Sequence, residues 1–206
     1  MKYKVCGNAN RHNLSQLLAL QPDYLGFIFY RPSPRYMGDD PELMQYISSI
    51  RASQKVGVFV NADIAEIRNR TDAYALDLVQ LHGTESPEFC KQIRQLRPVI
   101  KAFGIDTGFD CTQLSAYTDS CDYFLFDTAS KQYGGSGKLF DWTLLDNYQG
   151  DKPFLLSGGI AHTQASAIKA ITHPALLGVD VNSRFEVSPG IKNIPVLKTF
   201  IDELQH

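Results

Sequence analysis

The sequence FLLSGGI at residues 154–160 and the sequence LGVDVNS at residues 177–183 decide the fold. Each begins as a short apolar strand and runs directly into a small polar turn. Two such turns after consecutive strands are typical of an eight-stranded α/β barrel, in which phosphate is commonly bound after strands seven and eight. The rest of the chain must then supply six earlier strands.

The two turns have the chemistry of a phosphate site. Gly158 and Gly159 have no Cβ, so backbone N–H groups there can approach a ligand closely. Asn182 and Ser183 add side-chain hydrogen-bond donors. A Gly-Gly pair alone is more often only a tight turn. The presence of one such turn after each of two consecutive strands shifts the balance towards phosphate binding.

Six further β-type runs precede these two, with helical patterns between them. Their starts recur every 20–30 residues or so, which is the length of a βα unit. The runs are Tyr3–Cys6, Tyr24–Phe29, Lys55–Val60, Leu78–Leu81, Val99–Phe103 and Tyr123–Phe126. Eight βα units predict a closed (β/α)8 TIM barrel that forms one domain over residues 1–206. An open doubly wound sheet is the alternative, but no G-x-G-x-x-G motif follows the first strand.

The helical signals between the strands differ in strength. Asp40-Pro41-Glu42 and Ser86-Pro87-Glu88 each combine an N-cap residue, a proline at the first helical position and an acidic first turn. The patterns at about 111–117 and near Leu144 are much weaker. The glycine-rich loop at residues 134–137 is either a mobile lid or a linker.

Composition excludes several classes of function. A net charge of −2 without a Lys/Arg cluster argues against nucleic-acid binding. No apolar run approaches the roughly 20 residues of a membrane span, and the N-terminus is too polar for a signal peptide. The four cysteines form no C-x-x-C pair and are expected to be reduced thiols in the cytoplasm. The five scattered histidines predict no metal site, and we expect no cofactor.

Two candidate catalytic groups follow strands one and six. Cys6 and Asp127 would flank the phosphate site, because strands one, eight, seven and six are neighbours in a closed barrel. A thiol and a carboxyl group on either side of a sugar phosphate suit proton transfer in an isomerase. Either residue alone is more often structural, the cysteine as a small buried hydrophobe and the aspartate as an N-cap.

Lys4 lies two residues before Cys6 and therefore on the same side of the strand. We expect it to lie beneath Cys6 and to favour the thiolate. The alternative is a structural ion pair with an inward carboxylate such as Asp180. Arg35, in a proline-stiffened loop, is suited to bind a carboxylate with two bonds. His82 either lines the mouth of the barrel or caps a turn.

The same residues carry a resemblance to a known family, phosphoribosylanthranilate isomerase. The matching segments stand in the family's order and cover almost the whole chain. They are KVCG at 4–7, GFIF at 26–29, SPR at 33–35, VGVFVN at 56–61, VQLHG at 79–83, FDT at 126–128, GGSG at 134–137, FDW at 140–142, SGG at 157–159, GVDVNS at 178–183 and PG at 189–190.

The resemblance implies a (β/α)8 barrel that acts in tryptophan biosynthesis. The expected reaction is an Amadori-type rearrangement of N-(5-phosphoribosyl)anthranilate to 1-(2-carboxyphenylamino)-1-deoxyribulose 5-phosphate. Carried over by position, Asp127 is the general acid, Cys6 the general base, and Arg35 the ligand of the anthranilate carboxylate. The implied substrate-binding residues also include His82, Gly158, Gly159, Asp180, Asn182 and Ser183. The implied partner is a small-molecule sugar phosphate, and the sequence leaves monomer and homodimer open.

The chain departs from the family at three places. Val5 stands where the family usually has isoleucine, a conservative change. Arg184 stands where the family often has glycine, which would bring a charge near the phosphate. The Asn8-Ala9-Asn10 segment replaces the common Ile/Leu-Thr after the first strand.

Other functions fit the residues less well. The related histidine-pathway isomerase has an aspartate in place of Cys6 and a second phosphate site with glycines in the first half of its barrel. Metal-dependent epimerases require paired His and Asp ligands. A phospho-ligand-binding barrel without catalysis would not need both Cys6 and Asp127.

Overall fold

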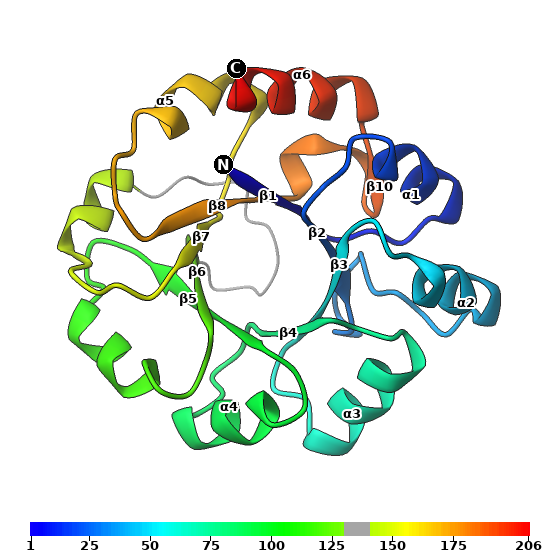
Figure 1. Ribbon diagram of the computed structural model, residues 1–206, viewed down its shortest axis with the longest axis horizontal. Coiled ribbons are helices and arrows are strands. Elements are labelled where there is room, and N and C mark those ends of the chain that lie inside the picture. The colour runs from blue at the N-terminus through cyan, green and yellow to red at the C-terminus, as the bar shows by residue number, and fades with distance from the viewer. Residues whose placement is uncertain (130–140) are drawn as a thin grey trace.

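Eight parallel strands close into a barrel in chain order (Figure 1). The computed structural model describes residues 1–129 and 141–206, so the glycine-rich loop at 134–137 lies outside the described residues. The strands are β1 (Lys2–Val5), β2 (Tyr24–Ile28), β3 (Gln54–Phe59), β4 (Leu78–Leu81), β5 (Val99–Ile105), β6 (Tyr123–Thr128), β7 (Phe154–Leu156) and β8 (Leu176–Val181). The predicted eight-stranded barrel is confirmed.

Helices form an outer ring around the strands (Figure 1). The α-helices are α1 (Arg11–Leu18), α2 (Pro41–Ser49), α3 (Ile64–Ala73), α4 (Pro87–Arg94), α5 (Ala165–Lys169) and α6 (Ile194–Gln205). The predicted N-caps are present, since Asp40 accepts a hydrogen bond from Glu42 N and Ser86 accepts one from Phe89 N. Each cap satisfies one of the unpaired N–H groups at the start of its helix.

The prediction of eight α-helices is wrong for two of the connections. The segments after β5 and β6 are 3-10 helices, η1 (Cys111–Tyr117) and η2 (Trp142–Asn147). Within η1, Ser115 Oγ donates to Thr112 O and Thr118 Oγ1 donates to Leu114 O. After β7, the 3-10 helix η3 (His162–Gln164) leads into the short α5.

The sequence analysis also missed a small hairpin after β8. The 3-10 helix η4 (Ser183–Phe185) is followed by β9 (Glu186–Ser188) and β10 (Ile191–Lys192), which pair antiparallel. Gly190, with a φ of 84°, allows the tight reversal between the two strands. The hairpin is short and pairs only with itself, so it carries little strand signal.

The barrel interior changes from apolar to polar along the strand direction. Alternate residues of each strand point inwards, and the lower layers are filled by the apolar cluster Tyr24, Val56, Leu78, Ile100, Ala102, Leu125 and Leu155. Two residues further along β4 and β6 the same inward positions hold Gln80 and Asp127. The period of two that builds the core therefore also directs polar side chains towards one end of the barrel.

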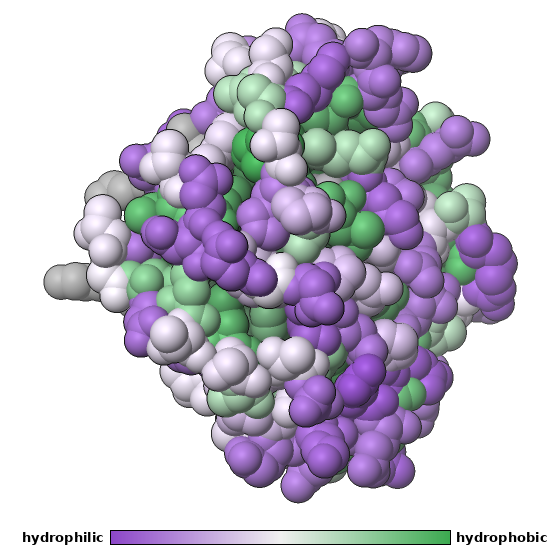
Figure 2. Space-filling model, turned by 60° about the vertical axis from the view of Figure 1, so that its left-hand side comes forward, coloured by the Kyte–Doolittle hydropathy of each residue, from purple (hydrophilic) through white to green (hydrophobic). Residues whose placement is uncertain are grey.

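The outer surface is largely polar, with small apolar areas between charged side chains in the view of Figure 2. Met1 and Val187 are the large hydrophobic residues that are exposed in the described part of the chain. None of the helices described in 1–129 and 141–206 has the length and apolar character that crossing a membrane requires.

The contact between β8 and β1 predicts a large effect of one substitution. A Cβ on Gly178 would overlap the Lys2 carbonyl oxygen at the seam of the barrel. We expect Gly178→Ala to lower the free energy of unfolding by about 1–3 kcal/mol in chemical denaturation. Gly108→Ala is the matched control, because its Cβ would lie 3.5 Å from the nearest atom, Asp106 Oδ1. Equal stability of the two variants would contradict tight packing at this seam.

Candidate active site

A hollow opens at the carboxyl end of the barrel. It is lined by strand-end residues from β1, β4, β6, β7 and β8, together with parts of β2 and β3. The predicted site residues that line it are Cys6, His82, Asp127, Gly158, Gly159, Asp180, Asn182 and Ser183. The structure thus brings the thiol and the carboxyl group of the two candidate catalytic residues to the same hollow.

All the predicted site residues lie in the described part of the chain. Among them, Arg35 is the one that does not line this hollow. Its neighbour Ser33 does line it, and Ser33 Oγ accepts a hydrogen bond from Arg35 N at 3.1 Å. The Arg35 guanidinium is bound to Glu186, a residue that the sequence analysis did not select. The signal for Glu186 was its place just after the predicted phosphate turn.

Cys6 follows β1 directly and is 4% exposed. Its backbone N–H donates to Val181 O at 2.9 Å, which fixes it against the end of β8. Gly26 makes room for the thiol, because a Cβ there would lie 2.7 Å from Cys6 Sγ. Burial raises the pKa of the Cys6 thiol above its usual range, while Lys4 and Lys192 act to lower it and Asp180 acts to raise it.

Lys4 takes part in both interactions that the sequence suggested as alternatives. Its Nζ donates to Asp180 Oδ1 at 2.9 Å inside the barrel, and its charge acts to lower the pKa of the Cys6 thiol. Burial acts against the ammonium, but Asp180 and Cys6 raise the pKa of Lys4 above its ordinary value. Lys4 therefore remains charged beneath Cys6. It does not bring the thiol pKa below normal, because burial outweighs its effect.

Asp127 is held by bonds to both carboxylate oxygens. Thr128 N donates to Oδ1 at 2.9 Å, and His82 Nε2 lies 3.3 Å from Oδ2. Gln80 Nε2 lies 2.8 Å from His82 Nδ1 on the other side of the ring. With the Gln80 amide donating to Nδ1, the imidazole proton is on Nε2 and points at Asp127.

The sequence analysis missed Gln80, although a signal existed. It lies between Leu78 and His82 at the inward period of β4, where a polar residue is unusual. Gln80 is 1% exposed, and its Oε1 has no hydrogen-bond partner in the described part of the chain. A buried amide that is only partly satisfied costs stability, which favours a role in orienting His82.

A buried ion pair fixes the turn that carries His82. Lys101 Nζ donates to Glu85 Oε2 at 3.0 Å and also to the carbonyl oxygens of Leu81 and Gly83. These two carbonyls flank His82 in the chain. Glu85 in turn accepts bonds from Gly83 N at 2.9 Å and 3.2 Å. The backbone around His82 is therefore held on both sides, and its side chain lines the hollow.

The two predicted phosphate turns lie side by side at the rim. Gly158 and Gly159 have φ values of 89° and 65°, which glycine adopts without strain. A Cβ on Gly158 would lie 2.5 Å from Thr128 N, so only glycine fits beside β6. Arg184 also lines the hollow, next to Ser183, where the departure from the family pattern places a charge.

The described residues contain no group of three or more His, Cys, Asp or Glu side chains arranged to hold a metal ion.

Comparison with known proteins gives the family. A family model described as N-(5′-phosphoribosyl)anthranilate (PRA) isomerase matches residues 3–203. The chain belongs to the N-(5′-phosphoribosyl)anthranilate isomerase family.

Individual members of this isomerase family are similar over their whole length. The N-(5′-phosphoribosyl)anthranilate isomerase of Parabacteroides distasonis is 46% identical over 208 residues, which covers 100% of this chain and 94% of the relative. The crystal structure of the Thermotoga maritima enzyme is 35% identical with a TM-score of 0.86, covering 100% of this chain and 98% of that one.

A further crystal structure of a family member contains a ligand, reduced 1-(o-carboxyphenylamino)-1-deoxyribulose 5-phosphate. It is 31% identical to this chain with a TM-score of 0.84, and covers 100% of this chain and 98% of that one. These likenesses give the isomerase family and the barrel.

The Gln80–His82–Asp127 series predicts an effect on turnover. Gln80→Leu removes the bond to His82 Nδ1, so the ring can rotate and Asp127 loses a fixed partner. We expect kcat to fall roughly 10- to 100-fold with little change in KM, because a displaced catalytic group costs rate rather than binding. Gln92→Leu on the exposed face of α4 is the control. A wild-type kcat for Gln80→Leu would exclude this role.

The charges around Cys6 predict shifts of opposite sign. Lys4→Met removes a group that lowers the thiol pKa, and Asp180→Asn removes one that raises it. The pH midpoint for alkylation of Cys6 should therefore move up in Lys4→Met and down in Asp180→Asn. The measurement is the rate of iodoacetamide labelling against pH, with the labelled cysteine assigned by mass spectrometry. Midpoints that move in the same direction in both variants would contradict these charge effects.

Proposed function

We propose that this chain converts N-(5′-phosphoribosyl)anthranilate to 1-(2-carboxyphenylamino)-1-deoxyribulose 5-phosphate, the isomerisation of its family, in tryptophan biosynthesis. One observation supports the assignment of roles most directly. Cys6 after β1 and Asp127 on β6 line one hollow, and the turns after β7 and β8 lie between them. A pentose phosphate anchored at those turns would have a thiol and a carboxyl group on its two sides.

Asp127 acts as the general acid in the first step. Its carboxyl proton passes to the furanose ring oxygen as the C1′–O bond breaks, and the lone pair of the anthranilate nitrogen forms the C1′=N bond of an open-chain iminium ion. The Asp127 carboxylate that forms is held in place by Thr128 N and His82. Groups that stabilise the product carboxylate favour release of the proton.

Cys6 acts as the general base in the second step. The thiolate removes the proton from C2′, and the electron pair of the C–H bond forms the C1′=C2′ bond of an enolamine. As the enolamine tautomerises to the ketone, C1′ gains a proton and the C2′ hydroxyl loses one. The proton that Cys6 takes up offsets the one that Asp127 gives, so no net proton or electron is gained or lost. Burial disfavours the thiolate, and the ammonium of Lys4 beneath the thiol offsets part of that penalty.

The phosphate and the carboxylate of the substrate bind at the polar rim of the hollow. The Gly158-Gly159 turn, Asn182 and Ser183 bind the phosphate through backbone and side-chain N–H or O–H groups. Arg35 binds the anthranilate carboxylate, and His82 and Asp180 complete the polar wall around the pentose. The partner is a small phosphorylated molecule, and the cytoplasmic location and the choice between monomer and homodimer stay predictions.

Turnover of two variants tests these roles. Cys6→Ser and Asp127→Asn keep the shape of each side chain but remove its function in proton transfer. We expect each to lower kcat by roughly 10²- to 10⁴-fold, while the reduced product analogue still binds. Cys111→Ser in η1, outside the hollow, is the matched control and should turn over like the wild type.

Near wild-type kcat in both Cys6→Ser and Asp127→Asn would place the chemistry elsewhere. No turnover by the wild type, together with binding of the product analogue, would instead indicate a binding protein.

A further inference from the structure

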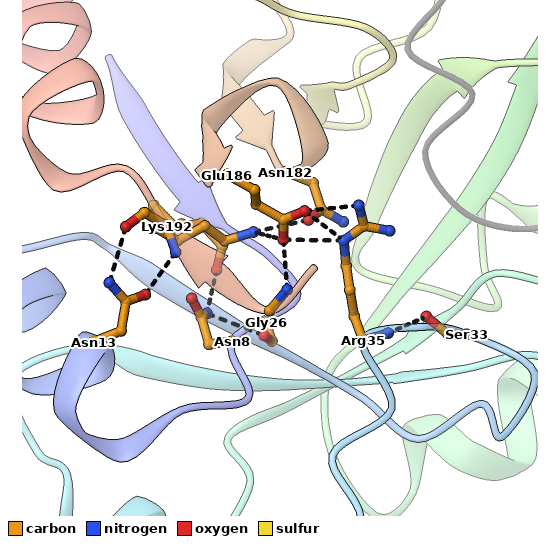
Figure 3. A network of polar contacts seen from close by, with 10 residues as sticks. Asn8, Asn13, Gly26, Ser33, Arg35, Asn182, Glu186 and Lys192 are labelled. Carbon is orange, nitrogen blue, oxygen red and sulfur yellow. Dashed lines mark hydrogen bonds and ion pairs between the residues drawn. The ribbon is translucent and has the colours of Figure 1, made fainter. Parts of the chain in front are cut away.

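A buried ionic cluster lies beside the hollow, between the hairpin after β8 and the loop after β2 (Figure 3). Arg35 Nε donates to Glu186 Oε1 and Oε2 at 3.0 Å and 2.9 Å, and Arg35 Nη2 donates to Oε2 at 2.7 Å. The two side chains are 10% and 4% exposed. Charge-assisted bonds from two nitrogens fix the plane of the guanidinium.

Lys192 extends the cluster to the phosphate turn. Its Nζ donates to Glu186 Oε1 at 2.7 Å and to Asn182 Oδ1 at 2.8 Å, and its side chain is completely buried. The Lys192 backbone is itself fixed, because Asn13 of α1 accepts from its N–H at 2.7 Å and donates to its carbonyl at 2.9 Å (Figure 3). Lys192 therefore reaches the two acceptors from a rigid base.

The charges of the cluster keep Glu186 ionised. Burial acts to raise the pKa of Glu186, but Arg35 and Lys192 together hold it below its usual value. Burial lowers the pKa of Lys192, and Glu186 opposes that effect. The two groups that face Lys192 Nζ are both acceptors, which suits an ammonium. A single carboxylate thus holds two cations in place, and its loss would leave both without their ionic partner.

Gly7 allows Arg35 and Asn182, at the two ends of the cluster, to lie close together. Its φ is 77°, and a Cβ there would lie 2.7 Å from both Arg35 Cδ and Asn182 Oδ1. Arg35 and Asn182 therefore approach each other over the residue that follows Cys6. The chain segment with the thiol, the loop with Arg35 and the phosphate turn share one point of contact.

We propose that Glu186 and Lys192 are positioning residues that hold Arg35 and Asn182 as one preorganised unit, which sets the preference of the site for a substrate that carries both a carboxylate and a phosphate. Glu186 accepts from Nε and Nη2 of the Arg35 guanidinium, and no hydrogen bond from Nη1 is present among the described residues, so Nη1 is left for the substrate carboxylate. Lys192 occupies Asn182 Oδ1, so the amide NH₂ is left for the phosphate side. The inference rests on the roles of Arg35 and Asn182 in the proposed function.

Glu186→Gln tests the carboxylate end. Glutamine keeps the size of the side chain but loses the charge that grips Arg35. The probes are the reduced aminoketose phosphate product analogue and its phenyl counterpart without the carboxylate, both measured by isothermal titration. We expect the carboxylated probe to bind roughly 10- to 100-fold more weakly and the phenyl probe to change less than about twofold. Equal weakening of both probes would overturn the proposal.

Lys192→Met provides a second, independent test if Glu186→Gln fails to fold. It keeps the Arg35–Glu186 pair but frees Asn182, so binding of inorganic phosphate should weaken roughly 10-fold while the ratio of affinities for the two probes is preserved. Loss of that ratio with unchanged phosphate binding would contradict the assignment. Glu42→Gln on α2, whose side chain is 86% exposed, is the matched control and should bind all three ligands like the wild type.

The same measurements separate this inference from the proposed function. A wild type that does not turn over N-(5′-phosphoribosyl)anthranilate would contradict the proposed function. A wild type that does turn it over, combined with unaltered probe selectivity in Glu186→Gln, would contradict only the positioning role.

Discussion

The pairing of β1 with β8 is the constraint on which the rest of the structure depends. It closes the barrel with Lys4 opposite Asp180 in register, and the same two side chains form a buried ion pair at 2.9 Å. A buried pair of this kind gains little net stability but requires both partners to be present. Because it spans the closing seam, it also sets the height at which Cys6 leaves β1 beside the turn after β8.

The polar side chains at this end of the barrel, including this pair, form three linked groups rather than isolated contacts. Lys4 and Asp180 lie under the thiol, the Gln80–His82 pair supports Asp127, and the Glu186–Lys192 pair supports Arg35 and Asn182. In each group a buried, rigidly held residue orients one that faces the hollow. Preorganised groups of this kind reduce the reorganisation needed when charge develops in the reaction.

Much of this arrangement could be predicted from the sequence, for reasons of period and spacing. The positions of Cys6 and Asp127 at the ends of strands one and six predicted that they share one rim, and both line the hollow there. The Gly158-Gly159 turn is visible without any structure. Glu186 escaped prediction because its role arises from a contact distant in sequence, 151 residues from Arg35. Gln80 contacts His82 only two residues away, and its signal was a polar residue at an inward position of β4. The weakly marked helical segment at 111–117 is the 3-10 helix η1.

A crystal structure of this chain with the reduced product analogue tests the central geometry most directly. We predict that the phosphate lies on the Gly158-Gly159 turn and beside Ser183, with Cys6 Sγ about 3–3.5 Å from C2′ and Asp127 on the other side of the pentose. A pentose whose C2′ faces away from Cys6, or a phosphate bound elsewhere on the rim, would contradict the assignment of the thiol and the carboxyl group to the two proton transfers.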